Sequence, residues 1–332
     1  LKTKKSFLVT NSFSEKVINW YELHGRHDLQ WRKAITPYRI WISEIMLQQT
    51  QVVTVEPYFK KFIKKYPTLK SIKNASEDEI LTLWSGLGFY KRARNIFQTK
   101  EIIHSEHKGR FPKTFEEIIK LPGIGKSTAG AIMSIAHKIP TPILDGNVKR
   151  ILKRYFSDDK NIFNEKELWN LSSSVSIATN SNFYTQGIMD IGATLCTPQN
   201  PECSRCPLSA NCNSAFLQVE AIKSKKTIDL KTLKMELSFF VTDQEVLLRK
   251  IDDQEIWRGL WSLPHTNESS LKVRSYNIEK IKHRLSHRIL EIDINLKKVT
   301  KKFIPKNNFQ YQWVKVNDVE NIALPKPIKK VI

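Results

Sequence analysis

Apolar residues follow two different periods in two parts of the chain. Up to about residue 217 they recur at helical spacing, as in a helix over 11–23 and an apolar helix that begins at Pro37. From about residue 233 they alternate with polar residues, which is typical of strands. A hairpin and a further strand are predicted by Leu237, Phe239, Val241, Val246, Leu248, Leu290, Ile292 and Ile294. The fold class is therefore predicted to be mainly α, with a C-terminal α+β domain.

The segment 121–125, Leu-Pro-Gly-Ile-Gly, predicts a tight turn between two helices. Pro122 ends the incoming helix, and Gly123 and Gly125 permit positive φ and a close approach of a ligand to the backbone. The next helix would present its free N–H groups there, which favours an anion. An ordinary glycine-closed turn is the alternative.

Charge indicates which anion to expect. The 332 residues include 54 Lys and Arg against 33 Asp and Glu, a formal net charge of +21. This excess favours a polyanionic partner, nucleic acid before membrane, because no long apolar span is visible. The first residues contain too short an apolar stretch for a secretory signal, so a cytosolic protein is expected.

Two carboxylates stand out from their surroundings. Asp145 precedes an apolar-periodic helix, where it is either an N-cap or a catalytic carboxylate kept ionised by the helix dipole. Glu44 interrupts the apolar helix that begins at Pro37. It is either a surface residue or a buried carboxyl whose raised pKa suits a general acid that protonates a purine nitrogen.

The four cysteines all fall within one short loop. They are spaced by six, two and five residues, at Cys196, Cys203, Cys206 and Cys212. Four thiolates in such a loop predict one metal centre, and the ligand count leaves zinc and an iron–sulfur cluster open.

Three segments together resemble a known family. LPGIGKSTAGAI, ILDGNVKR and WISEIMLQQTQV look like the helix-hairpin-helix DNA glycosylases, and among them the adenine DNA glycosylases (the MutY family) of base-excision repair. Members remove adenine mispaired with 8-oxoguanine or guanine. The cysteine spacing matches the [4Fe–4S] loop of this family and of endonuclease III. The resemblance implies a catalytic region over 1–217, a linker over 218–232 and a Nudix-like domain over 233–332 that recognises 8-oxoguanine.

Within the catalytic region the resemblance implies a six-helix barrel over about 31–137. A cluster domain comes from 1–30 and 138–217, with the cluster loop at 196–212. The Nudix-like domain lacks the run of glutamates and arginine that binds metals in the hydrolases of that type, so it is expected to read rather than hydrolyse.

The resemblance also assigns site residues. Glu44 would be the general acid, Asp145 would stabilise the oxocarbenium-like sugar and Asn147 would orient the reacting groups. The adenine pocket would include Trp31, Arg32 and Ser127. DNA would be contacted by Gln48, Gln49, Phe89, Tyr90, Gly123, Gly125, Lys126, Ser286 and His287, and the [4Fe–4S] cluster would be held by the four cysteines.

Ser127 decides the expected outcome of the reaction. Bifunctional relatives have at this position a lysine that forms a Schiff base and cuts the strand. Lys126 is one residue early, roughly 100° round a helix, and would point elsewhere. The prediction is therefore monofunctional hydrolysis that leaves an abasic site.

The chain departs from the family pattern at several places. Gln30 replaces a usual proline, Phe89 a tyrosine and Leu285 a phenylalanine, and the segment between Cys196 and Cys203 has neither Lys nor Arg. Two alternatives stay open: a pyrimidine glycosylase with lyase activity like endonuclease III, and a non-catalytic, cluster-containing DNA-binding protein. The expected partner is duplex DNA with an A:8-oxoguanine or A:G mismatch, bound by a monomer in a bacterial-type cytoplasm, associated with the nucleoid and not with a membrane.

Overall fold

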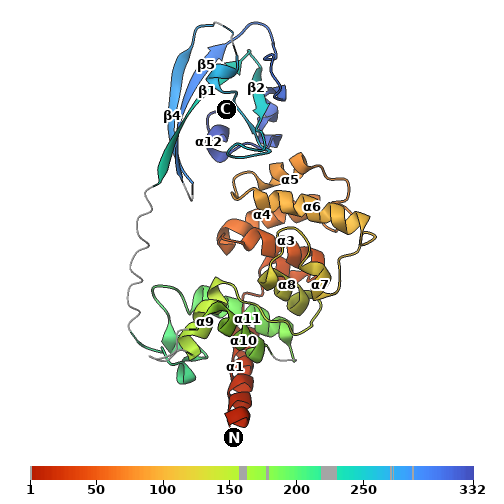
Figure 1. Ribbon diagram of the computed structural model, residues 1–332, viewed down its shortest axis with the longest axis vertical. Helices are drawn as coiled ribbons and strands as arrows, with labels where there is room; N and C mark the ends of the chain where they lie inside the picture. The colour runs from red at the N-terminus through yellow and green to blue at the C-terminus, as the bar shows by residue number, and fades with distance from the viewer. Residues whose placement is uncertain are drawn as a thin grey trace. The chain divides into compact units, whose positions relative to one another are not determined.

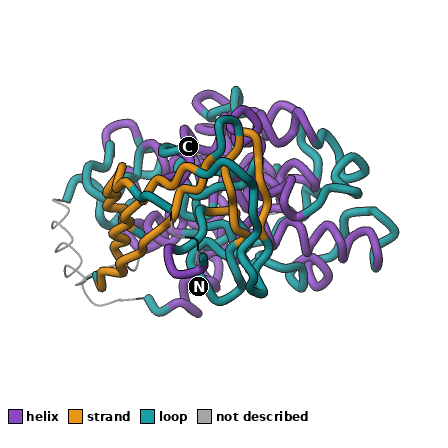
Figure 2. Tube along the Cα trace, turned by 90° about the horizontal axis from the view of Figure 1, so that it is seen from above, coloured by secondary structure: helices purple, strands orange, loops and turns teal. Residues whose placement is uncertain are grey.

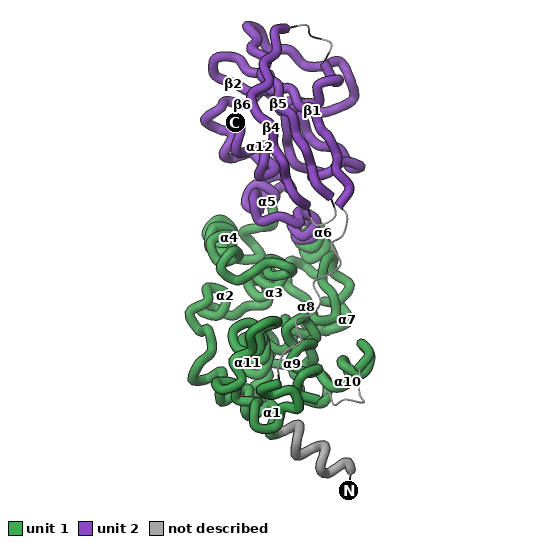
Figure 3. Tube along the Cα trace, turned by 90° about the vertical axis from the view of Figure 1, so that its left-hand side faces the viewer, with its two compact units in different colours: residues 1–74, 98–225 green, residues 75–97, 226–332 purple. Residues whose placement is uncertain are grey.

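The computed structural model describes residues 2–156, 163–176, 179–217, 230–269, 271, 273–285 and 288–332. The chain forms two compact units, each described here by itself (Figure 3). One comprises Leu1–Asn74 and Gln98–Lys225, and the other Ala75–Phe97 and Lys226–Ile332. The domain and linker boundaries expected from the sequence stay a prediction.

The first unit is helical in its described part (Figure 1). Its elements are α1 (Lys2–His24), α2 (Gln30–Lys33), α3 (Pro37–Leu47), α4 (Val52–Lys65), the end of α6 (Lys91–Ser105), α7 (Phe115–Ile118), α8 (Lys126–Ala131), the π-helix η1 (Ile132–Ala136), α9 (Gly146–Phe156), α10 (Glu165–Val175), α11 (Ser181–Thr194) and the short 3-10 turns η2 (Cys203–Arg205) and η3 (Ser209–Asn211).

Helix α3 lies at the centre of this unit and contacts α4, α8 and η1. It begins as predicted, because Pro37 occupies its first turn and Thr36 Oγ1 accepts a hydrogen bond from the Arg39 N–H at 3.2 Å. Most of its side chains are buried, among them Trp41 and Ile42. A helix so apolar is fixed on nearly all sides, which gives the side chain of Glu44 a rigid base.

The predicted helix–turn–helix at 121–125 is confirmed as α7, a turn and α8. Gly123 has a φ of +78°, a conformation that disfavours a side chain, and Gly125 is the N-cap of α8. Further on, a Cβ at Gly130 would lie 2.3 Å from the carbonyl oxygen of Pro142. The missing side chain therefore lets α8 pack directly on the segment that leads to Asp145.

Glycines in α11 serve the same purpose. A Cβ at Gly187 would meet Tyr21 and Val17 of α1 at 2.9–3.0 Å, and one at Gly192 would lie 2.6 Å from the Cβ of Asn147. The missing side chains therefore let α11 pack directly on α1 and on Asn147.

The second unit contains every strand of the described chain (Figure 2). Its elements are α5 (Glu77–Trp84), the start of α6, β1 (Lys231–Val241), β2 (Glu245–Lys250), β3 (Trp261–Ser262), η4 (Thr266–Glu268), β4 (Tyr276–Arg284), β5 (Arg288–Lys298), β6 (Tyr311–Lys315), η5 (Val316–Asn321) and α12 (Lys326–Lys329). The sheet has the order β3-β2-β1-β5-β4, with β6 paired to β2, and β1 and β5 run parallel.

The strand predictions are confirmed where the sequence alternates. β1 and β2 form the expected antiparallel hairpin and β5 covers residues 290–294. Strands β3, β4 and β6 were not foreseen. β4 is exposed along most of its length, so it has no alternating apolar face for the pattern to reveal. The mainly α fold with a C-terminal α+β domain is correct.

None of the helices in the described ranges combines the length and apolar composition that crossing a membrane requires.

Candidate active site

A cleft of about 1050 Å³ opens in the first unit. Its walls come from the loop before α2, from α3, from the start of α8, from α9 and from α11. The sequence-predicted residues that line it are Trp31, Arg32, Glu44, Gln48, Gln49, Ser127, Asp145 and Asn147. Side chains from segments more than a hundred residues apart thus meet around one space.

Glu44 lines the cleft from the otherwise apolar α3. Burial raises the pKa of its carboxyl to about 7, and the nearby charge of Asp145 adds to this rise, whereas Arg32 acts in the opposite direction. A carboxyl with this pKa is protonated in a large fraction of molecules near neutral pH, so it is able to donate a proton.

Asp145 caps a helix and also lines the cleft. Its Oδ1 accepts a hydrogen bond from the Val148 N–H at 2.8 Å, so it caps α9. It also lines the cleft opposite Glu44's helix. Burial raises the pKa of Asp145, against the hydrogen bonds from Val148 and Asn147 and the charge of Arg150. The backbone N–H groups favour the ionised form as expected, but burial outweighs them.

Asn147 is held at the cleft by Arg150, one turn further along α9. Arg150 Nη2 donates to Asn147 Oδ1 at 2.8 Å and to the carbonyl of Gly192 at 2.6 Å, while its Nε donates to the carbonyl of Cys196 at 2.6 Å. One guanidinium therefore connects the cleft wall, α11 and the first residue of the cysteine loop.

Ser127 and Lys126 point in different directions, as the helical geometry predicted. Ser127 Oγ accepts a hydrogen bond from the Leu144 N–H at 3.1 Å and so fixes the residue before Asp145. Lys126 Nζ lies 4.3 Å from the ring centroid of Trp169 and is not among the cleft-lining residues. No lysine is among the residues that line the cleft of the described chain.

Trp31 and Arg32 form part of the cleft wall. Trp31 is nearly buried and packs edge-on to Phe59 with ring centroids 5.4 Å apart, so its core role and its place at the cleft coexist. Arg32 forms a two-pronged ion pair with Asp190 of α11, with N···O distances of 2.6 and 3.0 Å. Its guanidinium carbon also lies 5.4 Å from the centroid of the Tyr21 ring.

Gln48 and Gln49 lie where α3 ends. Gln48 Nε2 donates to the carbonyl of Gly123 at 3.1 Å, which joins this end of α3 to the glycine turn. Gln49 has a φ of +56°, a left-handed conformation that a non-glycine residue adopts at a cost of about 1 kcal/mol. Gly123, Gly125 and Lys126 are exposed beside this end of the helix. Both glutamines line the cleft.

Phe89 and Tyr90 belong to the second unit. Phe89 is 47 % exposed and has a φ of +49°, while the Tyr90 hydroxyl accepts a hydrogen bond from the Gly86 N–H at 3.1 Å. Arg92 stacks near the Phe89 ring at 5.4 Å. Tyr90 thus closes the loop that presents Phe89. Ser286 and His287, the predicted 8-oxoguanine readers, lie outside the described residues.

The four cysteines line a single pocket of about 210 Å³. Arg154 borders it, with Nη1 3.3 Å from Cys196 Sγ. Burial raises the pKa of the Cys206 thiol to about 11, with the other three sulfurs adding to it. Four thiolates are stable here only with positive charge among them, which suits a metal centre. Among the described residues no group of three or more His, Cys, Asp or Glu side chains is placed to hold a single metal ion.

Sequence reasoning missed three cleft residues, Arg26, Arg150 and Gln186, and also Asp190, which lies behind the cleft wall and binds Arg26. Asp190 carries a signal that could have been read, since it is a lone carboxylate in the apolar, small-residue helix α11, as Glu44 is in α3. Arg26 and Arg150 offered none, because arginines are common throughout this basic chain.

Comparison with known proteins agrees with this architecture. Residues 42–173 match the HhH-GPD superfamily of base excision DNA repair proteins, and residues 238–332 match the NUDIX domain. Among solved structures, a thermostable thymine-DNA glycosylase superposes with a TM-score of 0.58 at 28% identity, covering 65% of this chain and 99% of that one. An endonuclease III trapped as a covalent intermediate with DNA has a TM-score of 0.52 at 22% identity, covering 61% of this chain and 93% of that one, and shows the fold alone.

Similarity to one group of enzymes extends over nearly the whole chain. The adenine DNA glycosylase of Buchnera aphidicola subsp. Acyrthosiphon pisum (strain APS) is 41% identical over 344 residues, which cover 96% of each protein. That of Buchnera aphidicola subsp. Baizongia pistaciae (strain Bp) is 40% identical and covers 98% of this chain and 97% of the relative. The cleft, the helix–hairpin–helix and the C-terminal α+β unit therefore belong to a member of the adenine DNA glycosylase family.

Proposed function

We propose that this enzyme hydrolyses the N-glycosidic bond of adenine mispaired with 8-oxoguanine or guanine and leaves an abasic site. The observation that carries the proposal is the meeting of Glu44 and Asp145 at one cleft, with the pKa of Glu44 raised to about 7. One carboxyl able to donate a proton and a second able to bear negative charge are what cleavage of a glycosidic bond requires.

The proposed reaction uses three residues of the cleft. The adenine leaves the duplex for the cleft, which costs a few kcal/mol and less at a mismatch. Glu44 protonates a ring nitrogen of the departing adenine, so that the base leaves as a neutral molecule. Asp145 stabilises the positive charge that develops on the sugar, Asn147 orients the reacting groups, and water completes the hydrolysis.

The monofunctional outcome is supported by what surrounds the hairpin. A lyase needs an amine that attacks the sugar carbon. Ser127 stands at the position of such a lysine, and its hydroxyl accepts a hydrogen bond from the Leu144 N–H. The ammonium group of the neighbouring Lys126 lies over the ring of Trp169. We therefore expect the strand to stay intact after the base is released.

A panel of duplexes tests this function. Single-turnover reactions on adenine opposite 8-oxoguanine, guanine and thymine are analysed with and without alkali. Breakage only after alkali, fastest opposite 8-oxoguanine, is the expected result. Breakage without alkali would reveal a lyase nucleophile, and no breakage on any duplex would oppose the assignment of adenine as the substrate.

The pocket of Cys196, Cys203, Cys206 and Cys212 suits a [4Fe–4S] cluster. Its four sulfurs would ligate the irons, and the cluster would supply the positive charge that the buried thiolates need. Arg150 and Arg154 attach the loop to α9, so the cluster would stabilise the helix that Asp145 caps. Iron and sulfide in the purified protein, with broad visible absorbance, would support this, whereas stoichiometric zinc would oppose it.

The substrate proposal includes the second unit. Its exposed Phe89 is suited to enter the base stack, and the loop of Ser286 and His287 is proposed to recognise 8-oxoguanine. We further propose that the enzyme acts as a monomer on nucleoid DNA in the bacterial cytoplasm, in keeping with its net charge of +21 and its bacterial relatives.

A further inference from the structure

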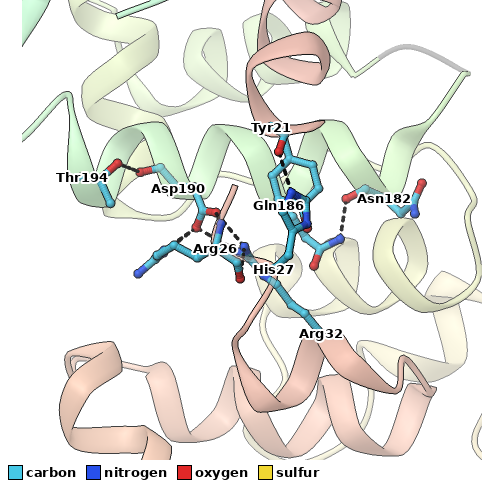
Figure 4. Close-up of polar contacts among 8 residues, drawn as sticks. All are labelled: Tyr21, Arg26, His27, Arg32, Asn182, Gln186, Asp190 and Thr194. Atoms are coloured by element: carbon cyan, nitrogen blue, oxygen red, sulfur yellow. Dashed lines mark hydrogen bonds and ion pairs between the residues drawn. The ribbon is translucent and has the colours of Figure 1, made fainter. Parts of the chain in front are cut away.

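Asp190 is a fully buried carboxylate beside the cleft. Its side chain has 0% exposure, and it sits on α11 between Gln186 and Thr194 (Figure 4). A buried carboxylate is stable only when it is paired and hydrogen-bonded. Asp190 satisfies this condition with two arginines, so its place in the fold depends on both.

The two arginines approach it from the segment that forms the cleft wall. Arg26 donates through Nε at 2.8 Å, through Nη2 at 2.5 Å and through its backbone N–H at 2.9 Å. Arg32 donates through Nη1 and Nη2 at 2.6 and 3.0 Å, and its side chain is 6% exposed. Such two-pronged pairs fix a guanidinium in orientation as well as in position.

Both arginines line the cleft, and Arg32 acts on the carboxyl of Glu44. Arg32 is close enough to Glu44 to oppose the rise in the pKa of that carboxyl. Glu44 faces Asp145 and Arg32, and the other charged residues that line the cleft are Arg26 and Arg150. Asp190 faces Arg26, Arg32 and the ring of Tyr21.

We infer that Asp190 is a positioning residue: it fixes Arg32 on the cleft wall, and by neutralising part of the arginine charge it sets the pH range in which Glu44 donates its proton. The group of three has a net charge of +1. Without the carboxylate it has a net charge of +2 beside the acid, and without Arg26 it has none. The two losses therefore act on Glu44 in opposite directions.

The inference rests on the proposed role of Glu44 as general acid, and pH profiles of single-turnover adenine release test it. The wild-type rate falls as pH rises because the acid loses its proton. In Asp190→Asn the uncompensated positive charge beside Glu44 should move this falling limb to lower pH by about 0.5–1 unit. The plateau should also fall, because Arg32 loses its orientation. Arg26→Gln moves the limb to higher pH, and Asp190→Glu restores part of the wild-type profile.

Glu165→Gln is the matched control, since it removes an exposed carboxylate paired with Lys149 at 3.5 Å, away from the cleft. It leaves the profile unchanged. A folded Asp190→Asn enzyme with the wild-type limb overturns the inference. If Asp190→Asn does not fold, Arg26→Gln is the deciding variant. A falling limb of Arg26→Gln that is unchanged or moved to lower pH then overturns the inference. A wild-type profile with no falling limb would instead contradict the role of Glu44.

Discussion

At the scale of single residues, the two carboxyls of the cleft, Glu44 and Asp145, have different surroundings. Glu44 projects from an apolar helix, and its pKa is raised to about 7. Burial raises the pKa of Asp145 as well, but the backbone hydrogen bonds that it receives at the start of α9 oppose this rise. The difference arises from the backbone: the middle of a helix offers no free N–H group, whereas its first turn does.

The raised pKa of Glu44 predicts how the rate depends on pH. The acid works only when protonated, so single-turnover release should be near its plateau at pH 6 and fall above pH 7, by about tenfold per unit well above the pKa. Rates measured from pH 5.5 to 9 check this. A profile that stays flat to pH 9 would contradict the assignment.

Two substitutions of Asp145 distinguish its role as a helix cap from the role of its negative charge. Asparagine caps helices as well as aspartate, so Asp145→Asn should leave the melting temperature nearly unchanged and lower the excision rate by about 100-fold or more. Asp145→Ala should lose a further ~1 kcal/mol of unfolding free energy, because the cap goes too. Should Asp145→Asn keep full activity, the residue is a cap alone.

At the scale of elements, the cleft depends on how closely helices approach one another. Glycines let α8 contact the segment before Asp145 and let α11 contact Asn147. Ser127 and Arg150 then hold these segments by hydrogen bonds. The two sides of the site are thus positioned by packing as much as by polar contacts.

Gly130→Ala tests this packing. The new Cβ would meet the carbonyl oxygen of Pro142 at 2.3 Å, so α8 and the 142–145 segment must separate. We expect a loss of about 1–3 kcal/mol in unfolding free energy and slower excision. Gly125→Ala is the control for stability, since its Cβ would have nothing within 4 Å. Equal stability of both variants would show that the close approach is unimportant.

Much of the fold could be read from the sequence because its signals are local. Pro37, the turn at 121–125 and the alternation from Leu237 each act within a few residues. β4 gave no signal, since its exposed residues have no buried face, and the parallel pairing of β1 with β5 joins residues far apart in the chain. The link from Asp190 to Arg26 and Arg32 spans some 160 residues and needed the tertiary structure, whereas Glu44 was recognisable as a lone charge in an apolar helix.

At the scale of the whole molecule, charge governs the encounter with substrate. A net charge of +21 favours binding to DNA of any sequence, while on the proposed function the cleft contacts only the base that enters it. Affinity and selectivity therefore have different physical origins in this enzyme.

Salt concentration should change the affinity for DNA far more than the rate of excision. Binding to undamaged duplex releases counterions, so we expect its affinity to fall by about 1000-fold between 50 and 200 mM salt if six or more phosphates are contacted. Fluorescence anisotropy with a labelled duplex measures this. The single-turnover rate at saturating enzyme should change far less, and an affinity insensitive to salt would argue against the electrostatic account.

On the proposed mechanism, Glu44 supplies the proton that releases adenine. The most direct test of this role is the amount of free adenine released in a single turnover from a duplex with adenine opposite 8-oxoguanine, by wild-type enzyme and by Glu44→Gln at equal occupancy of DNA. Glutamine keeps the size of the side chain but has no acidic proton, so release should slow by at least about 100-fold while duplex binding persists. Release at the wild-type rate by Glu44→Gln would contradict the account.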